Sequence, residues 1–124
     1  MVQVDISQLS AECNAWRESL RNFREEFNKS EAKLRQVAGQ PLSKEQLQDV
    51  EHLHNQFHIQ LINIHDLKQS IKIHERNISF ESSADGQLRE ETVARHESLF
   101  DQYQTLSATL HELRDEFTRF LDRT

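Results

Sequence analysis

A heptad seam opens the chain and constrains its fold more than any other feature. Between residues 6 and 37, large apolar residues recur at alternating spacings of three and four positions. This spacing places them on one stripe of a helix, whereas the side chains of a strand change face at every residue. Only Ser30 interrupts the seam, which consists of Ile6, Leu9, Cys13, Trp16, Leu20, Phe23, Phe27, Leu34 and Val37.

Breaks between the apolar patterns divide the chain into three long helices. The first should end before Gly39, which we expect in a left-handed conformation, with Pro41 just beyond. Residues 42–47, LSKEQL, carry a capping box and a hydrophobic staple, so the second helix should begin at residue 44. A polar segment with an Asp-Gly pair, ESSADGQ, separates it from the third. The predicted helices cover residues 5–38, 44–80 and 87–122.

Short connections force consecutive helices to lie antiparallel. The sequence therefore predicts an all-α fold, an elongated up-down-up three-helix bundle with coiled-coil-like heptad packing, formed by residues 1–124 as a single domain. The polar start of the third helix should be less well packed than the rest. Counting turns predicts three layers: Trp16 with Ile64 and Leu99, Leu20 with Leu61 and Tyr103, and Phe23 with Phe57 and Leu106.

The predicted bundle is similar to spectrin-repeat architecture in its size, its helix count and the core residue Trp16 of its first helix. It also resembles the N-terminal regulatory domains of membrane-fusion syntaxins. That second resemblance implies a three-helix domain that folds back on another helix. Both resemblances concern architecture.

Charge and cysteine content exclude several classes of partner and location. The net charge is −6 and no third of the chain is basic, which disfavours nucleic acid and anionic membranes as partners. Cys13 is the single cysteine, so no intrachain disulfide can form. The N-terminus lacks a basic segment followed by an apolar one, so we expect no secretory signal and a cytoplasmic location.

No phosphate loop or nucleophile motif is present in the sequence, and we expect no enzyme activity and no cofactor.

Four of the seven histidines lie within residues 52–65, HLHNQFHIQLINIH. At 100° per residue, His54, His58 and His65 share a stripe that borders the apolar seam, while His52 and His74 fall on the far side. His54 and His58 could bind a metal ion together with His111 of the third helix, because side chains four positions apart converge. Solvated histidines are the more common outcome at such positions, so metal binding is the alternative prediction.

A thiol offers a second possible site. Cys13, Lys68 and His96 could share one layer near the polar start of the third helix, where the two basic groups would lower the pKa of the thiol. A lone cysteine in an apolar seam is more often a small buried hydrophobe.

Four large apolar residues of the second helix lie away from its seam. On an otherwise outward face they would be exposed unless something covers them. We therefore predict a helical protein–protein interaction or scaffold module without enzyme activity, which associates with itself or another protein through this outer face. The predicted interface residues are Ile59, Ile62, Ile73 and Phe80.

Overall fold

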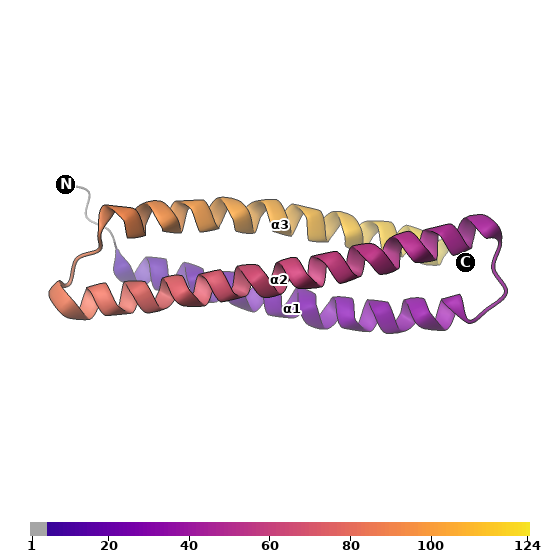
Figure 1. Cartoon of the computed structure of the whole chain (residues 1–124), viewed down its shortest axis with the longest axis horizontal. Coiled ribbons are helices and arrows are strands. Elements are labelled where there is room, and N and C mark those ends of the chain that lie inside the picture. Colours follow the sequence, from indigo (N-terminus) through magenta and orange to yellow (C-terminus); the bar gives the residue numbers. More distant parts are fainter. Residues whose placement is uncertain (1–4) are drawn as a thin grey trace.

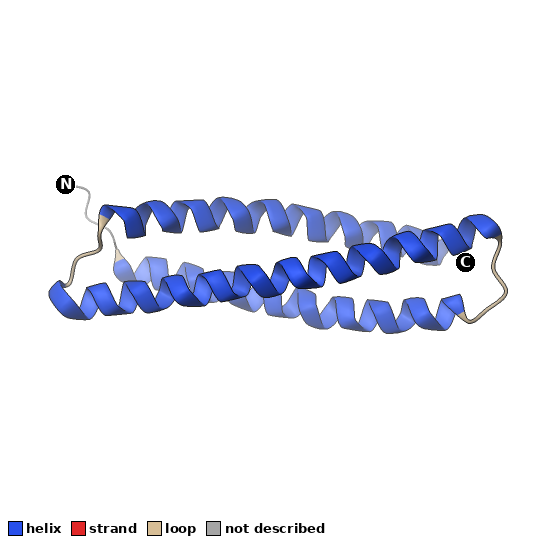
Figure 2. Cartoon of the chain, in the orientation of Figure 1, coloured by secondary structure: helices blue, strands red, loops and turns tan. Residues whose placement is uncertain are grey.

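Three long helices make up the structure (Figure 1), a computed structural model that describes residues 5–124. They are α1 (Ile6–Ala38), α2 (Lys44–Asp85) and α3 (Glu90–Asp122). Figure 2 shows only helices and connecting loops over this range, which confirms the predicted all-α, up-down-up three-helix bundle. The first four residues of the predicted domain lie outside the described part.

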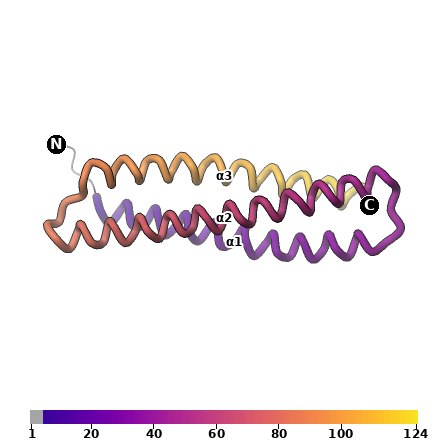
Figure 3. Tube along the Cα trace, in the orientation of Figure 1, coloured from indigo at the N-terminus to yellow at the C-terminus, as the bar shows by residue number. Residues whose placement is uncertain are grey.

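The helices run side by side along the long axis of the molecule. The continuous trace in Figure 3 shows α1 and α3 running in one direction and α2 running back in the opposite direction. The α2–α3 connection lies at the end where α1 begins, and the α1–α2 connection lies at the end where the chain finishes (Figure 1). At 1.5 Å per residue, the 33 residues of α1 and of α3 each span about 50 Å. None of the three helices described has the length and apolar character that crossing a bilayer requires.

The predicted capping box at the start of α2 is confirmed. The Ser43 hydroxyl accepts a hydrogen bond from the Gln46 amide at 3.2 Å, and the Gln46 side chain accepts one from the Ser43 amide at 2.9 Å. Two amides that lack helical partners are thereby satisfied. Asp5 caps α1 in a similar way, accepting a hydrogen bond from the Gln8 amide.

The predicted end of the second helix and the predicted role of Gly39 were both wrong. Helix α2 continues to Asp85 rather than residue 80, and Gly86 ends it in the left-handed conformation, at φ 74°. Gly39 instead has φ −78°, and its N–H bonds back to the last turn of α1. The Ser83 hydroxyl, in the last turn of α2, bonds to carbonyls of the preceding turn, that of Ser79 at 2.8 Å and that of Phe80 at 3.2 Å. These bonds are compatible with a continuing helix.

A carboxylate from the end of α2 anchors the start of α3. Glu81 accepts hydrogen bonds from the Arg89 amide at 2.8 Å and from the Thr92 hydroxyl at 2.6 Å. These bonds hold the pKa of Glu81 below its usual value. The side chain of Arg89, the N-cap residue, makes no capping hydrogen bond, and Glu81 fixes the start of α3 through the Arg89 amide and the Thr92 hydroxyl instead. This contact explains why α3 begins at Glu90, later than the predicted residue 87.

The core follows heptad spacing in α2 from Leu53 to Ile78, and a cluster of aromatic rings lies in the half of the bundle where α2 begins. Phe57 packs edge-on against Phe27 and Phe117, with ring centroids 5.2 and 5.3 Å apart. The predicted layer of Phe57 with Phe23 and Leu106 was therefore wrong. Because α2 is longer than predicted, its pairing with α3 shifts along the axis. The buried residues of α2 are Leu53, Phe57, Gln60, Ile64, Leu67, Ile71, His74 and Ile78.

Helices α1 and α3 meet through long side chains. Trp16 stacks on Phe100 and Tyr103, each with ring centroids 5.9 Å apart. Nearly three turns further along α1, Glu26 accepts two hydrogen bonds of 2.7 Å from Arg114 of α3. The predicted packing of Trp16 in the core is confirmed, since this side chain is 5% exposed.

Candidate functional site

The outer face of α2 carries the four residues predicted as an interface, and all four are exposed. Their exposed fractions range from 45% to 71%, with Phe80 at the upper end. With the buried residues of α2 at heptad positions a and d, Ile59, Ile73 and Phe80 occupy c positions and Ile62 an f position. Both positions point away from α1 and α3. We call Ile59, Ile62, Ile73 and Phe80 the outer α2 face.

Two opposite charges lie on this same face. Asp66 is at a c position and Arg76 at an f position, and both side chains are exposed. Neither is part of an ion pair within residues 5–124. The outer α2 face is therefore mixed: Ile59 and Ile62 lie at one end and Phe80 at the other, and between them Ile73 lies between Asp66 and Arg76.

The three histidines predicted as metal ligands lie on exposed surfaces. His54 and His58 are exposed on α2. His111 is exposed on α3, where its Nδ1 lies 2.7 Å from the Ser107 carbonyl and its ring packs edge-on against Phe23. Within residues 5–124, the only group of three potential ligands whose atoms converge contains none of them.

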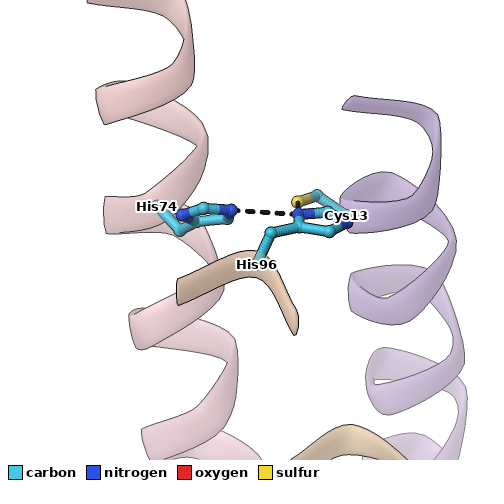
Figure 4. Close-up of side chains that lie close together, drawn as sticks. All are labelled: Cys13, His74 and His96. Carbon is cyan, nitrogen blue, oxygen red and sulfur yellow. Dashed lines mark hydrogen bonds between the residues drawn. The ribbon is translucent and has the colours of Figure 1, made fainter. Parts of the chain in front are cut away.

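That convergent group consists of Cys13, His74 and His96, one residue from each helix (Figure 4). His74 Nε2 lies 3.0 Å from His96 Nδ1, and Cys13 Sγ lies 3.8 Å from the same nitrogen. All three potential ligand atoms lie within 4.8 Å of one another. The exposed fractions are 0% for Cys13 and His74 and 5% for His96, so the cluster is closed to solvent.

Heptad position explains how these side chains meet. His74 lies three residues after Ile71 and four before Ile78, both buried, so it occupies a core position. The predicted placement of His74 on the far side of α2 was wrong. A straight 100° count drifts from a heptad seam by roughly 20° per heptad, and nearly three heptads separate His74 from His54. Reading the seam itself, rather than the angle, would have placed His74 in the core.

The cluster leaves buried polar atoms without partners. His74 Nδ1 and His96 Nε2 have none among the described residues. The nearest carboxylate oxygen to His96 Nε2, that of Glu12, is 3.6 Å away, beyond an ordinary hydrogen bond. Buried polar atoms without a hydrogen-bond partner are uncommon in folded proteins. They indicate either a loss of stability or a binding partner that is absent here.

Burial controls the protonation of the cluster. Desolvation raises the pKa of the Cys13 thiol to about 12, and the nearby Glu75 and Glu12 carboxylates act in the same direction. Desolvation lowers the pKa of His74 to about 4, and it also lowers that of His96, where Glu12 opposes it. The resting cluster is therefore a neutral thiol beside two neutral imidazoles.

The predicted layer of Cys13, Lys68 and His96 was partly wrong. Cys13 and His96 do meet, but His74 takes the third place. The charges that lower the pKa of Lys68, after its desolvation, are those of Arg24, Lys72, Arg21 and Arg17, so Lys68 lies among basic groups. The thiol pKa is raised, not lowered, because no cation close to it outweighs its burial.

Comparison of the chain with protein-family models, with curated proteins and with solved structures finds no match.

Proposed function

We propose that this chain is a non-enzymatic helical interaction module that pairs with a second copy of itself through the outer α2 face. The observation that supports the proposal is the concentration of exposed apolar side chains on one helix. Among residues 5–124, six large hydrophobic residues are exposed, and five of them belong to α2: Leu47, Ile59, Ile62, Ile73 and Phe80. Apolar groups gathered in this way mark interaction surfaces more often than scattered ones do.

The order of residues along α2 favours an antiparallel, two-fold pair. Ile71 lies midway between Asp66 and Arg76, and it also lies midway between Ile62 and Phe80. If two α2 helices cross antiparallel at this point, Asp66 faces Arg76 of the partner subunit and Ile62 faces Phe80 of the partner subunit. A two-fold interface uses the same surface on both copies, so each favourable contact occurs twice.

The axis of this pair has an apolar centre. Ile73 lies close to the two-fold axis, so the Ile73 side chains of both copies meet near it, flanked by the two charge pairs. One pair of helices is a small interface, and we expect its association to depend on concentration.

We further propose a cytoplasmic location, since one cysteine allows no intrachain disulfide.

Sedimentation velocity over a range of protein concentrations tests the proposal. The wild type should shift from monomer to dimer as concentration rises. Ile62→Glu with Ile73→Glu should remain monomeric with an unchanged far-ultraviolet circular dichroism spectrum, because both side chains are outside the core. A wild type that stays monomeric at high concentration would rule out self-association.

Charge reversal tests the antiparallel register. Asp66→Arg and Arg76→Asp should each weaken the dimer, because each places like charges face to face. The double variant exchanges the two charges and should recover association. Asp101→Arg makes the same change of charge on the exposed surface of α3 and should leave the dimer intact. A double variant no better than either single variant would contradict this register.

A further inference from the structure

The cluster of Cys13, His74 and His96 combines one sulfur and two imidazole nitrogens as potential ligands (Figure 4). Thiolate and imidazole together favour borderline or soft transition metals, whereas magnesium and calcium require oxygen ligands. These three ligand atoms therefore suit zinc and ions of similar chemistry.

The spacing of these atoms is close to that of a zinc site. With Zn–S near 2.3 Å and Zn–N near 2.0–2.1 Å, tetrahedral ligand atoms lie roughly 3.3–3.6 Å apart. The separations around His96 Nδ1 are 3.0 Å to His74 Nε2 and 3.8 Å to Cys13 Sγ. These two edges need adjustments of a few tenths of an ångström, and the third separation, between Cys13 Sγ and His74 Nε2, lies within 4.8 Å and must shorten to the same range for all three atoms to bind one ion.

Without an ion, hydrogen bonding cannot satisfy this cluster. His96 Nδ1 has a single lone pair, so it can accept a hydrogen bond from the His74 imidazole or from the Cys13 thiol, but not from both. His74 Nδ1 and His96 Nε2 are also without partners among residues 5–124. A central cation would bind the three converging atoms, Cys13 Sγ, His74 Nε2 and His96 Nδ1, at once, while His74 Nδ1 and His96 Nε2 would stay outside its coordination.

The surroundings of the cluster favour positive charge. Glu12 lies 3.6 Å from His96 Nε2, on the side of the ring away from the cluster. A carboxylate in that place can accept a hydrogen bond from a metal-bound histidine and fix its tautomer. Arg17, whose charge acts on the thiol, is already paired with Glu75. The charges that act on the three ligands are those of Glu12, Glu75, Glu81 and Glu97, against Arg17 and Arg95.

We propose that Cys13 Sγ, His74 Nε2 and His96 Nδ1 bind one zinc ion, with Glu12 as the carboxylate that orients His96. Three protein ligands from three helices leave one tetrahedral position for a water molecule. The ion crosslinks α1, α2 and α3 at the end of the bundle where α1 begins. This site is separate from the outer α2 face and from the histidines of residues 52–65.

Titration of the chelator-treated, untagged protein with cobalt(II) tests the site. Tetrahedral cobalt bound to a thiolate gives a near-ultraviolet charge-transfer band and intense visible bands. We expect both in the wild type at one equivalent, with release of about one proton at pH 7.5, because a bound thiol must lose its proton. Zinc should abolish the bands and raise the melting temperature. The proposal would be overturned if the folded wild type gave no such bands with cobalt. It would also be overturned if the protein bound zinc through surface histidines while the cobalt bands stayed absent.

Matched variants identify the ligands. Cys13→Ala and His74→Leu should lose the cobalt bands, while His58→Leu, an exposed histidine on the same helix, should retain them. Glu12→Gln should weaken binding about 10- to 100-fold, against no change for the exposed Glu18→Gln.

Circular dichroism checks that each variant is folded, and the wild-type bands test the site even if a ligand variant unfolds. Bands that persist in folded Cys13→Ala would exclude the cluster. Ile62→Glu with Ile73→Glu should bind cobalt like the wild type, so this result does not depend on the proposed dimer.

Discussion

His74 occupies a core position of α2 that the neighbouring turns fill with Ile71 and Ile78. Its ring contributes apolar surface to the core, but two nitrogens enter with it. One nitrogen faces His96 at 3.0 Å, and the other has no partner among residues 5–124. A histidine held in this way stays neutral, because its charged form would be buried without a counterion in contact.

Lowering the pH should therefore destabilise the metal-free protein through His74. Desolvation, His96 and Arg95 lower its folded pKa to about 4, Glu81 opposes them, and the ordinary value is 6.5. The unfolded chain then binds a proton that the folded chain does not. The contribution of neutral His74 to the free energy of unfolding is fully present above pH 6.5. It is lost as pH falls towards 4, where the loss reaches roughly 3 kcal/mol. Urea unfolding with a chelator present, at pH 7.5, 5.5 and 4.5, measures this loss.

Two histidine variants separate this effect from general acid sensitivity. His74→Leu should flatten the pH dependence between 6.5 and 4, leaving the smaller part that comes from His96. His58→Leu removes an exposed histidine from the same helix and should leave the wild-type profile unchanged. Parallel profiles for His74→Leu and the wild type would show that the buried imidazole does not set the slope.

The ends of the helices show how far local sequence signals reach. The capping box at Ser43 and Gln46 was predicted correctly, because both hydrogen bonds form within four consecutive residues. The conformations of Gly39 and Gly86 could not be predicted in the same way. Glycine is permitted in both the right- and left-handed regions, so its presence marks a turn without selecting its hand. At Gly86 the left-handed form ends α2, and the chain then reaches Arg89, whose amide binds Glu81.

Alanine at the two glycines should have opposite consequences. Gly86→Ala should destabilise the fold by about 1–2 kcal/mol, because φ is 74° and an L-residue is strained there. Gly39→Ala should be neutral or stabilising by about 0.4–1 kcal/mol, since φ is −78° and the added methyl would meet only ordinary contacts of 3.5 and 3.8 Å. Thermal or urea unfolding of both variants measures the difference. A larger loss at Gly39 than at Gly86 would reverse the assignment of the left-handed turn.

The register between helices sets the limits of prediction for the whole molecule. A heptad seam looks the same after a shift of seven residues, so spacing alone identifies the core face of each helix but not the layer in which two residues meet. The predicted layers depended on where α2 ends, and that end lay at Asp85 rather than residue 80. The same shift explains why the cluster of Cys13, His74 and His96 was only partly foreseen. Fold class and core face follow from local pattern, whereas a site built from three helices requires their register.

Two substitutions one turn apart on α2 test the observed register. Phe57 is fully buried against Phe27 and Phe117, and Phe57→Ala should cost about 3–5 kcal/mol. Leu61, predicted at the centre of a layer, is only half-buried beside the core. Leu61→Ala should cost less than about 2 kcal/mol, because part of its surface is already in water. Urea unfolding gives both values, and equal losses would favour the layers predicted from turn counting.

The complete burial of Cys13 makes the opening of the bundle measurable as a chemical rate. In the folded, metal-free protein this thiol has no exposed surface, and its pKa of about 12 leaves almost no reactive thiolate at pH 8. An alkylating reagent can therefore modify it only while α1 is separated from α2 and α3. Because the chain has a single cysteine, each molecule reacts once, and the labelling rate divided by that of an unfolded peptide gives the fraction of time spent open. The position of Cys13 near the start of α1 means that this rate reports fraying of one end of the bundle, which unfolding curves of the whole molecule do not resolve.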